Sequence, residues 1–169
     1  MEMTSKQCAA ILTTRLAKEC SPENAKILAK NIDYNDAPFF GAKKKKAKLI
    51  SELVMLNAAL LIVAMNQVFN QEDARSIIDS FLSTANKSIF SAIEKQDSSF
   101  KANYEKRMAQ YFEILNQEKP AIEISRSFLI NLDLNPLNNF QGQLFVSAKF
   151  GESLSETIDI LKRMDISPS

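Results

Sequence analysis

The fold is decided by residues 53–65, which read LVMLNAALLIVAM. This stretch is apolar except for Asn57, so a helix formed by it is apolar on nearly every side. Such a helix is typical of the centre of a bundle, where neighbouring helices cover all its faces. A membrane span is the alternative, but the stretch rises only about 20 Å, and a bilayer core needs about 20 apolar residues. Glu52 and Asn66 interrupt its extension, so we expect no transmembrane segment.

Helix signals surround this central stretch. Thr4 and Gln7 have the spacing of a capping box, which predicts a helix over residues 5–19. Apolar residues recur at helical spacing between residues 77 and 93, and the same is true of residues 100–115. Further helix starts are predicted at Ser21, at Asn70, at Asp97 or Ser98, and at Pro120.

The C-terminal third gives a less regular pattern. Residues 140–150 partly alternate between apolar and polar, so helix and strand are both open. We favour a helix, because a single isolated strand would have no partner. Gly151 is expected to end this helix. Ser153 and Glu156 form a second capping box, which predicts a last helix that runs through Met164.

The composition narrows both the fold and the chemistry. Three glycines and five prolines are too few for the turns of a many-stranded sheet. The low number of glycines also argues against glycine-rich phosphate loops. The chain has no histidine, which excludes Ser-His-Asp and Cys-His catalysis and His-ligated zinc. We therefore expect an all-α, single-domain helical bundle over residues 1–169. It should have about six to eight helices, with three long ones at its centre in residues 43–118.

The two cysteines, Cys8 and Cys20, lie near the two ends of the first predicted helix. Twelve residues along a helix correspond to about 18 Å, which is beyond the reach of a disulfide. With no other thiol and no imidazole, they cannot form a metal site, and we expect no metal and no cofactor. Reduced cysteines and the absence of a long N-terminal apolar run favour a cytoplasmic protein. An intermolecular disulfide is the alternative.

Positive charge is concentrated in one run, which consists of Lys43, Lys44, Lys45, Lys46 and Lys48. Cations at the start of a helix oppose its dipole, so the run indicates a site for an anion. An acidic lipid surface or an acidic protein would serve. Nucleic acid is less favoured, because no arginine lies nearby and, apart from Phe39 and Phe40, interleaved aromatic residues are missing. A solvated helix edge is the plainer interpretation of the same run.

An aromatic loop precedes the lysines and contains Tyr34, Phe39 and Phe40. Two adjacent phenylalanines after a proline need to be buried somewhere, and one interpretation is that they close one end of the bundle. The other is that Tyr34, Phe39 and Phe40 contact a partner or a ligand.

Polar residues inside the predicted core form the remaining candidates. Glu52 and Asn57 are five residues apart on the central helix, which places them about 140° apart, so they do not face each other. One is expected to reach solvent and the other to make a buried hydrogen bond. Tyr104 and Tyr111 lie on a core-facing stripe, with their hydroxyls expected at the edge of the core.

No residue pattern identifies catalytic chemistry. We therefore expect a non-catalytic protein-interaction or structural module that self-associates, most simply as a homodimer. The homodimer is suggested by residues 120–133 and 140–150, whose large apolar side chains occupy both faces of short helices. Two alternatives stay open. One is a binder of an anionic ligand, acidic lipid or nucleic acid through Lys43–Lys48. The other is a small-ligand binding bundle, or an enzyme, with a cavity between helices.

Overall fold

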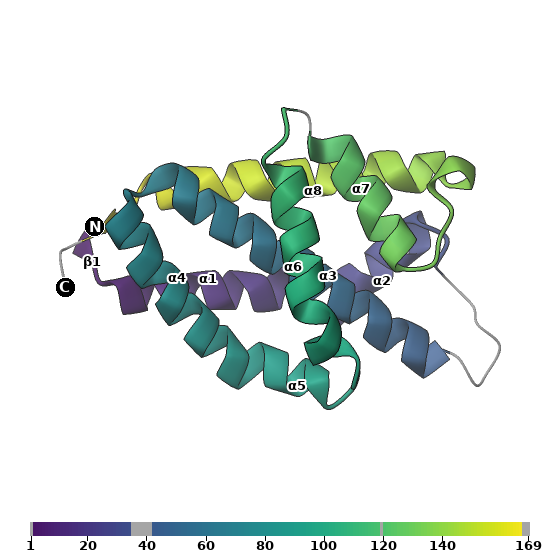
Figure 1. Cartoon of the computed structure of the whole chain (residues 1–169), viewed down its shortest axis with the longest axis horizontal. Coiled ribbons are helices and arrows are strands. Elements are labelled where there is room, and N and C mark those ends of the chain that lie inside the picture. The colour runs from purple at the N-terminus through teal and green to yellow at the C-terminus, as the bar shows by residue number, and fades with distance from the viewer. Residues whose placement is uncertain (1, 35–41, 119, 167–169) are drawn as a thin grey trace.

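A computed structural model describes residues 2–34, 42–118 and 120–166, and most of them are helical (Figure 1). The predicted all-α bundle with one very apolar central helix is confirmed. The α-helices are Ser5–Glu19 (α1), Pro22–Asn31 (α2), Ala42–Val68 (α3), Gln71–Ala85 (α4), Ser91–Glu94 (α5), Phe100–Leu115 (α6), Pro120–Asn131 (α7) and Phe140–Leu161 (α8). A π-helical turn, η1 (Asn86–Phe90), joins α4 to α5, and a 3-10 turn, η2 (Pro136–Asn138), lies between α7 and α8.

Helix α3 is the centre of the molecule. Every residue from Ser51 to Met65 is buried. Among the described elements, α3 contacts each of the other α-helices. Figure 1 shows it running obliquely through the structure, with α6 crossing it. Burying one leucine or isoleucine side chain contributes about 1.5–3 kcal/mol, so this helix supplies a large part of the hydrophobic stabilisation.

The length of α3 corrects one step of the sequence argument. The helix begins at Ala42, well before the apolar run, and by length and composition it could cross a membrane. The expectation that the stretch is too short was therefore wrong. In this fold, however, 83% of its most apolar window is buried inside the protein, which is typical of a bundle core.

Local capping explains where several helices begin. The Gln7 backbone N–H donates to Thr4 Oγ1 at 3.2 Å, and the Thr4 N–H donates to Gln7 Oε1 at 2.9 Å, so the predicted capping box is confirmed. Helix α1 spans the predicted residues. Ser21 caps α2, and Asn70 caps α4 by accepting from two backbone N–H groups.

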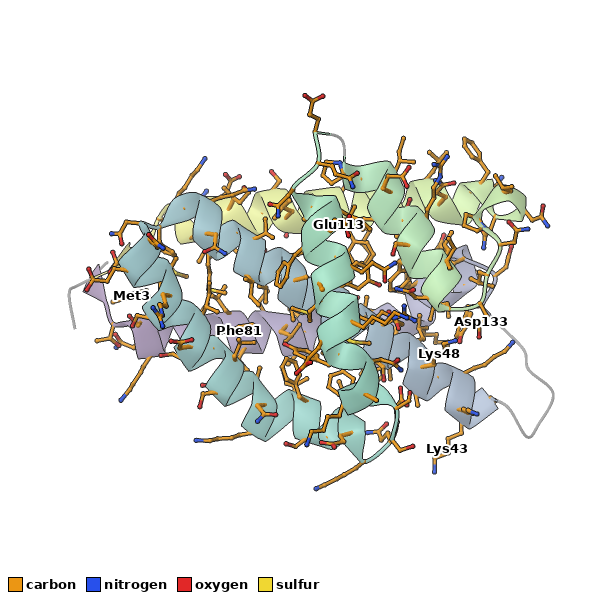
Figure 2. The ribbon with its side chains drawn as sticks, in the orientation of Figure 1. Met3, Lys43, Lys48, Phe81, Glu113 and Asp133 are labelled. Atoms are coloured by element: carbon orange, nitrogen blue, oxygen red, sulfur yellow. The ribbon has the colours of Figure 1, made fainter. Side chains whose placement is uncertain are left out.

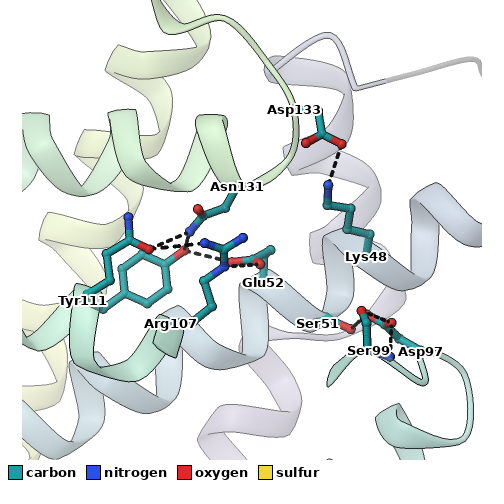
Figure 3. A network of polar contacts seen from close by, with 10 residues as sticks. Lys48, Ser51, Glu52, Asp97, Ser99, Arg107, Tyr111, Asn131 and Asp133 are labelled. Carbon is teal, nitrogen blue, oxygen red and sulfur yellow. Dashed lines mark hydrogen bonds and ion pairs between the residues drawn. The ribbon is translucent and has the colours of Figure 1, made fainter. Parts of the chain in front are cut away.

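The start of α6 differs from the prediction. Its N-terminal flanking residue is Ser99, which makes no side-chain cap hydrogen bond. Asp97 instead accepts from the Ser99 N–H and hydroxyl and from Ser51 Oγ, the last at 2.7 Å (Figure 3). The aspartate therefore links the turn before α6 to the central helix.

Helix α8 is longer than predicted. Residues 140–150 are helical as expected, but the helix continues through Gly151 to Leu161, so the predicted break and second capping box were wrong. Ser153 lies inside the helix, where its carbonyl accepts from Thr157 Oγ1 at 2.7 Å. One glycine costs a helix only about 1 kcal/mol. The packing of α8 against α7 and α3 outweighs that cost.

The two ends of the chain meet. Residues Glu2–Met3 (β1) pair in parallel with Asp165–Ile166 (β2), which holds the start of α1 close to the end of α8. Figure 1 shows both ends on the same side of the molecule. This short pairing leaves the all-α architecture unchanged.

Candidate functional site

The lysine run divides into two parts. Helix α3 begins at Ala42, so Lys43–Lys46 occupy its first turns and are exposed, and the sequence puts no acid in the first turn. Lys48 is different, because its Nζ forms an ion pair with Asp133 Oδ2 at 2.6 Å (Figures 2 and 3). That pair links α3 to the turn after α7. Figure 2 shows Lys43 pointing away from the helices.

Two of the sequence-predicted sites meet at Tyr34. This residue follows α2, is buried, and donates its backbone N–H to the Ala29 carbonyl at 2.9 Å. Lys45 Nζ lies 5.6 Å from the centre of the Tyr34 ring, within the range of a cation–π contact. Burial raises the pKa of Tyr34 to about 12, and the negative charges of Asp133 and Glu52 act in the same direction. The hydroxyl therefore stays protonated at neutral pH.

A pocket of about 460 Å³ lies between α2 and the first turns of α3. Lysines line it from both helices, and its remaining wall is largely apolar. The structure thus brings Tyr34 together with Lys45 and Lys46. It does not bring Lys43, Lys44 or Lys48 to the same pocket. The residues that line it include Lys26, Tyr34, Lys45, Lys46, Ala29 and Leu49.

Phe39 and Phe40, which the sequence suggested as partner contacts, lie outside the described residues. Their proposed role stays a prediction.

A buried polar network joins α3, α6 and α7, and the sequence argument missed it (Figure 3). Arg107 Nε donates to Glu52 Oε1 at 3.0 Å, and the Tyr111 hydroxyl donates to Glu52 Oε2 at 3.1 Å. Asn131 Nδ2 donates to the same hydroxyl at 3.1 Å. Burial raises the pKa of Glu52, although Arg107 opposes the shift. Among the described residues, none of the buried side-chain atoms that lack a partner belongs to this network, so it holds the three helices in one arrangement.

The network corrects two predictions about polar core residues. Glu52 and Asn57 are both buried, with 3% and 4% of their surface exposed, so neither reaches solvent. Asn57 Nδ2 donates to the Leu53 carbonyl at 2.9 Å. Tyr111 is fully buried, with its hydroxyl inside the core rather than at its edge. A signal was present, because Arg107 and Tyr111 are four residues apart and share one face of α6.

Large apolar side chains are exposed mainly on one part of the molecule. Of the seven that are exposed among the described residues, five belong to α7, η2 or the start of α8. We call these five residues the α7–α8 surface: Ile122, Ile130, Leu137, Phe140 and Leu144. Figure 1 shows α7 lying across α8 at the edge of the bundle, and Ser147 of α8 bonds to Ala121 and Ser125 of α7.

The part of this surface that comes from η2 and the start of α8 carries no charge. Residues 134–148 contain no Asp, Glu, Lys or Arg, although 24% of the whole chain is charged. The exposed fraction is 85% for Leu137, 64% for Phe140 and 52% for Leu144. Phe140 and Leu144 are one helical turn apart and therefore lie on one stripe of α8. A protein surface with these two properties resembles the core of an interface more than a solvated face.

Cys8 and Cys20 are both free and buried in the described structure. Burial raises the pKa of the Cys8 thiol to about 11 and that of Cys20 further, so both are neutral thiols at physiological pH. Within residues 2–34, 42–118 and 120–166, no group of three or more His, Cys, Asp or Glu side chains is placed to hold a metal ion.

No protein-family model, no curated protein and no solved structure matches this chain.

Proposed function

We propose that this chain is a non-catalytic interaction module that forms a homodimer through the α7–α8 surface. One observation carries the proposal: five of the seven exposed large hydrophobic side chains belong to this surface, and three of them lie in residues 134–148, which carry no charge. Apolar side chains are stabilised by leaving water, at about 25 cal/mol per Å² buried, and the described residues leave these five largely uncovered. A second copy offers the same surface in return.

The charges beside this surface fit a twofold arrangement. Glu123 and Arg126 form an ion pair of 2.7 Å on α7, and both side chains are about half exposed. Ile122 and Ile130 lie on either side of them along the helix. In an antiparallel pair of α7 helices whose twofold axis passes midway between Glu123 and Arg126, Arg126 of each copy approaches Glu123 of the other. The surface is therefore complementary to itself in charge as well as in hydrophobicity.

Sedimentation of paired variants tests this proposal. Leu144 and Ile27 are equally exposed, at 52% and 53%, but only Leu144 belongs to the α7–α8 surface. The unmodified chain should sediment as a dimer of the 19.0 kDa protomer at micromolar concentration. Leu144→Glu should shift it to monomer, because it buries a charge at the interface, whereas Ile27→Glu should leave the dimer intact. A monomeric unmodified chain at high micromolar concentration contradicts the proposal.

Charge exchange on α7 tests the antiparallel arrangement. Arg126→Glu alone, or Glu123→Arg alone, places like charges opposite each other and should weaken the dimer. The double variant restores opposite charges across the twofold axis and should recover most of the affinity. If the double variant is as weak as the single ones, this arrangement is wrong.

The expected cytoplasmic location stays a prediction that fractionation of cells can check.

A further inference from the structure

The pocket between α2 and α3 is separate from the α7–α8 surface and has the features of a small-ligand site. We propose that it binds a small anion with a short apolar body, such as an aliphatic carboxylate or an alkyl phosphate. The inference goes beyond the proposed function, because it concerns different residues and does not require self-association.

Charge in the pocket favours an anion. Lys26 comes from α2, and Lys45 and Lys46 come from α3, whereas Glu23 is the one acid among the residues that line the described pocket. Helix α3 also begins here, at Ala42, so its first backbone N–H groups have no partner within the helix. Lysines and the backbone amides at the start of a long helix both attract carboxylate and phosphate groups. The headgroup of the ligand should therefore lie near Lys45 and Lys46.

The rest of the pocket favours an apolar body attached to that anion. Ala25 and Leu49 line it and are buried, with 2% and 3% of their surface exposed. Ala29 and the Tyr34 ring complete this wall. An inorganic ion would leave the wall in contact with water, whereas a short alkyl chain would cover it. The volume of about 460 Å³ lies within the range of small-ligand sites.

Lys45 connects the two halves of the site. Its Nζ lies 5.6 Å from the centre of the Tyr34 ring, so the aromatic face holds the ammonium group at the boundary between the charged and apolar parts. The Tyr34 hydroxyl is protonated at neutral pH and can donate a hydrogen bond to an anion. A neutral alcohol of the same length would gain the apolar contacts but not these charged ones.

Backbone amide NMR shifts of the full chain, titrated with hexyl phosphate and hexanoate, test this inference. Both should shift the amides of Ala25, Ala29 and Leu49 at sub-millimolar concentration. Hexanol and inorganic phosphate should each bind at least about tenfold more weakly, because each supplies half of the interactions. Higher salt should weaken the two amphipathic anions. Vesicles of phosphatidylserine and phosphatidylcholine should not compete with them.

Three variants make the test specific. Lys45→Gln with Lys46→Gln should weaken hexyl phosphate at least tenfold, whereas Lys87→Gln with Lys106→Gln, which removes two exposed lysines elsewhere, should change nothing. Ala29→Leu fills the apolar wall without changing charge and should weaken hexyl phosphate more than inorganic phosphate. Equal binding of hexanol, equal binding of inorganic phosphate, binding of vesicles alone, or no shifts at millimolar ligand would each overturn the inference.

Discussion

The two longest uncharged stretches of this chain differ in how far their apolar side chains are buried. Residues 53–71 include the whole second half of α3 and the turn after it, and nearly all of their apolar side chains are buried. Residues 134–148 run from the end of α7 into α8, and three of their largest apolar side chains are more than half exposed. The absence of charge therefore indicates that a segment is suited to burial. It does not indicate whether other residues of the same chain or residues of a second molecule bury it.

Position in the bundle explains the difference. Helix α3 is surrounded by all the other described α-helices. Helix α8 packs against α7, α3 and α2, and its first turns lie at the rim of the bundle, where Asn139 Nδ2 donates to the Ile32 carbonyl at 2.6 Å. The opposite side of those turns has no cover among the described residues. In our account, a second copy covers it.

The sharpest test of this comparison uses the same substitution in both regions. Leu56 on α3 is fully buried, and Leu56→Ala should lower the free energy of unfolding by about 3–5 kcal/mol, because it leaves a cavity. Leu144→Ala should change the unfolding of the monomer by less than about 0.5 kcal/mol, yet weaken the dimer. Chemical denaturation at low protein concentration measures the first effect, and dilution measures the second. Equal losses in monomer stability would remove the distinction between the two regions.

The buried ion pair should give the next largest effect. Arg107→Ala leaves the Glu52 carboxylate without its cation and should cost about 3 kcal/mol at neutral pH. The loss should shrink toward acid pH, where Glu52 is protonated and no longer needs a cation. Urea denaturation of this variant at several pH values measures the effect. A loss that stays constant with pH would show that Arg107 acts through packing alone.

The pH dependence of stability should carry the signature of Glu52. Its pKa in the folded protein lies above the ordinary value of 4.5, so the folded state binds more protons than the unfolded state above that pH. The Glu52 contribution to stability is therefore greatest below pH 4.5 and falls as the pH rises through the folded pKa. Glu52→Gln should lack this fall. If the difference in unfolding free energy between the two proteins is constant from pH 4.5 to 8, Glu52 is not the source of this pH dependence.

Replacing either of two glycines of α8 with alanine should change the stability of the protein by a smaller amount, in opposite directions. Gly151 has open space where a Cβ would lie, so Gly151→Ala should stabilise the continuous helix by about 0.5–1 kcal/mol. At Gly142 a Cβ would lie 2.2 Å from Asn139 Oδ1, the acceptor that caps α8, so Gly142→Ala should destabilise the protein. Thermal unfolding measures both changes. Destabilisation by Gly151→Ala would instead support the helix break at Gly151 that the sequence predicted.

The sequence predicted features that depend on neighbouring residues. The capping box at Thr4, the cap at Asn70 and the central position of α3 all follow from patterns within a few turns of helix. The buried network was missed because Glu52, Arg107 and Asn131 come from three different helices and meet only in the folded chain. The break at Gly151 failed for a related reason, since packing between distant segments overrides a single weak residue.

Intermolecular NMR contacts between methyl groups, in a sample mixed from two isotope-labelled forms of the chain, test the central claim most directly. We expect contacts between protomers at Ile122, Ile130 and Leu144, and none at Ile11 or Ile27, which are also exposed but lie on α1 and α2. Leu144→Glu should abolish these contacts without changing the fold of the monomer. Contacts centred on Ile11 or Ile27, or no intermolecular contacts at millimolar concentration, would contradict the assignment of the α7–α8 surface as the site of self-association.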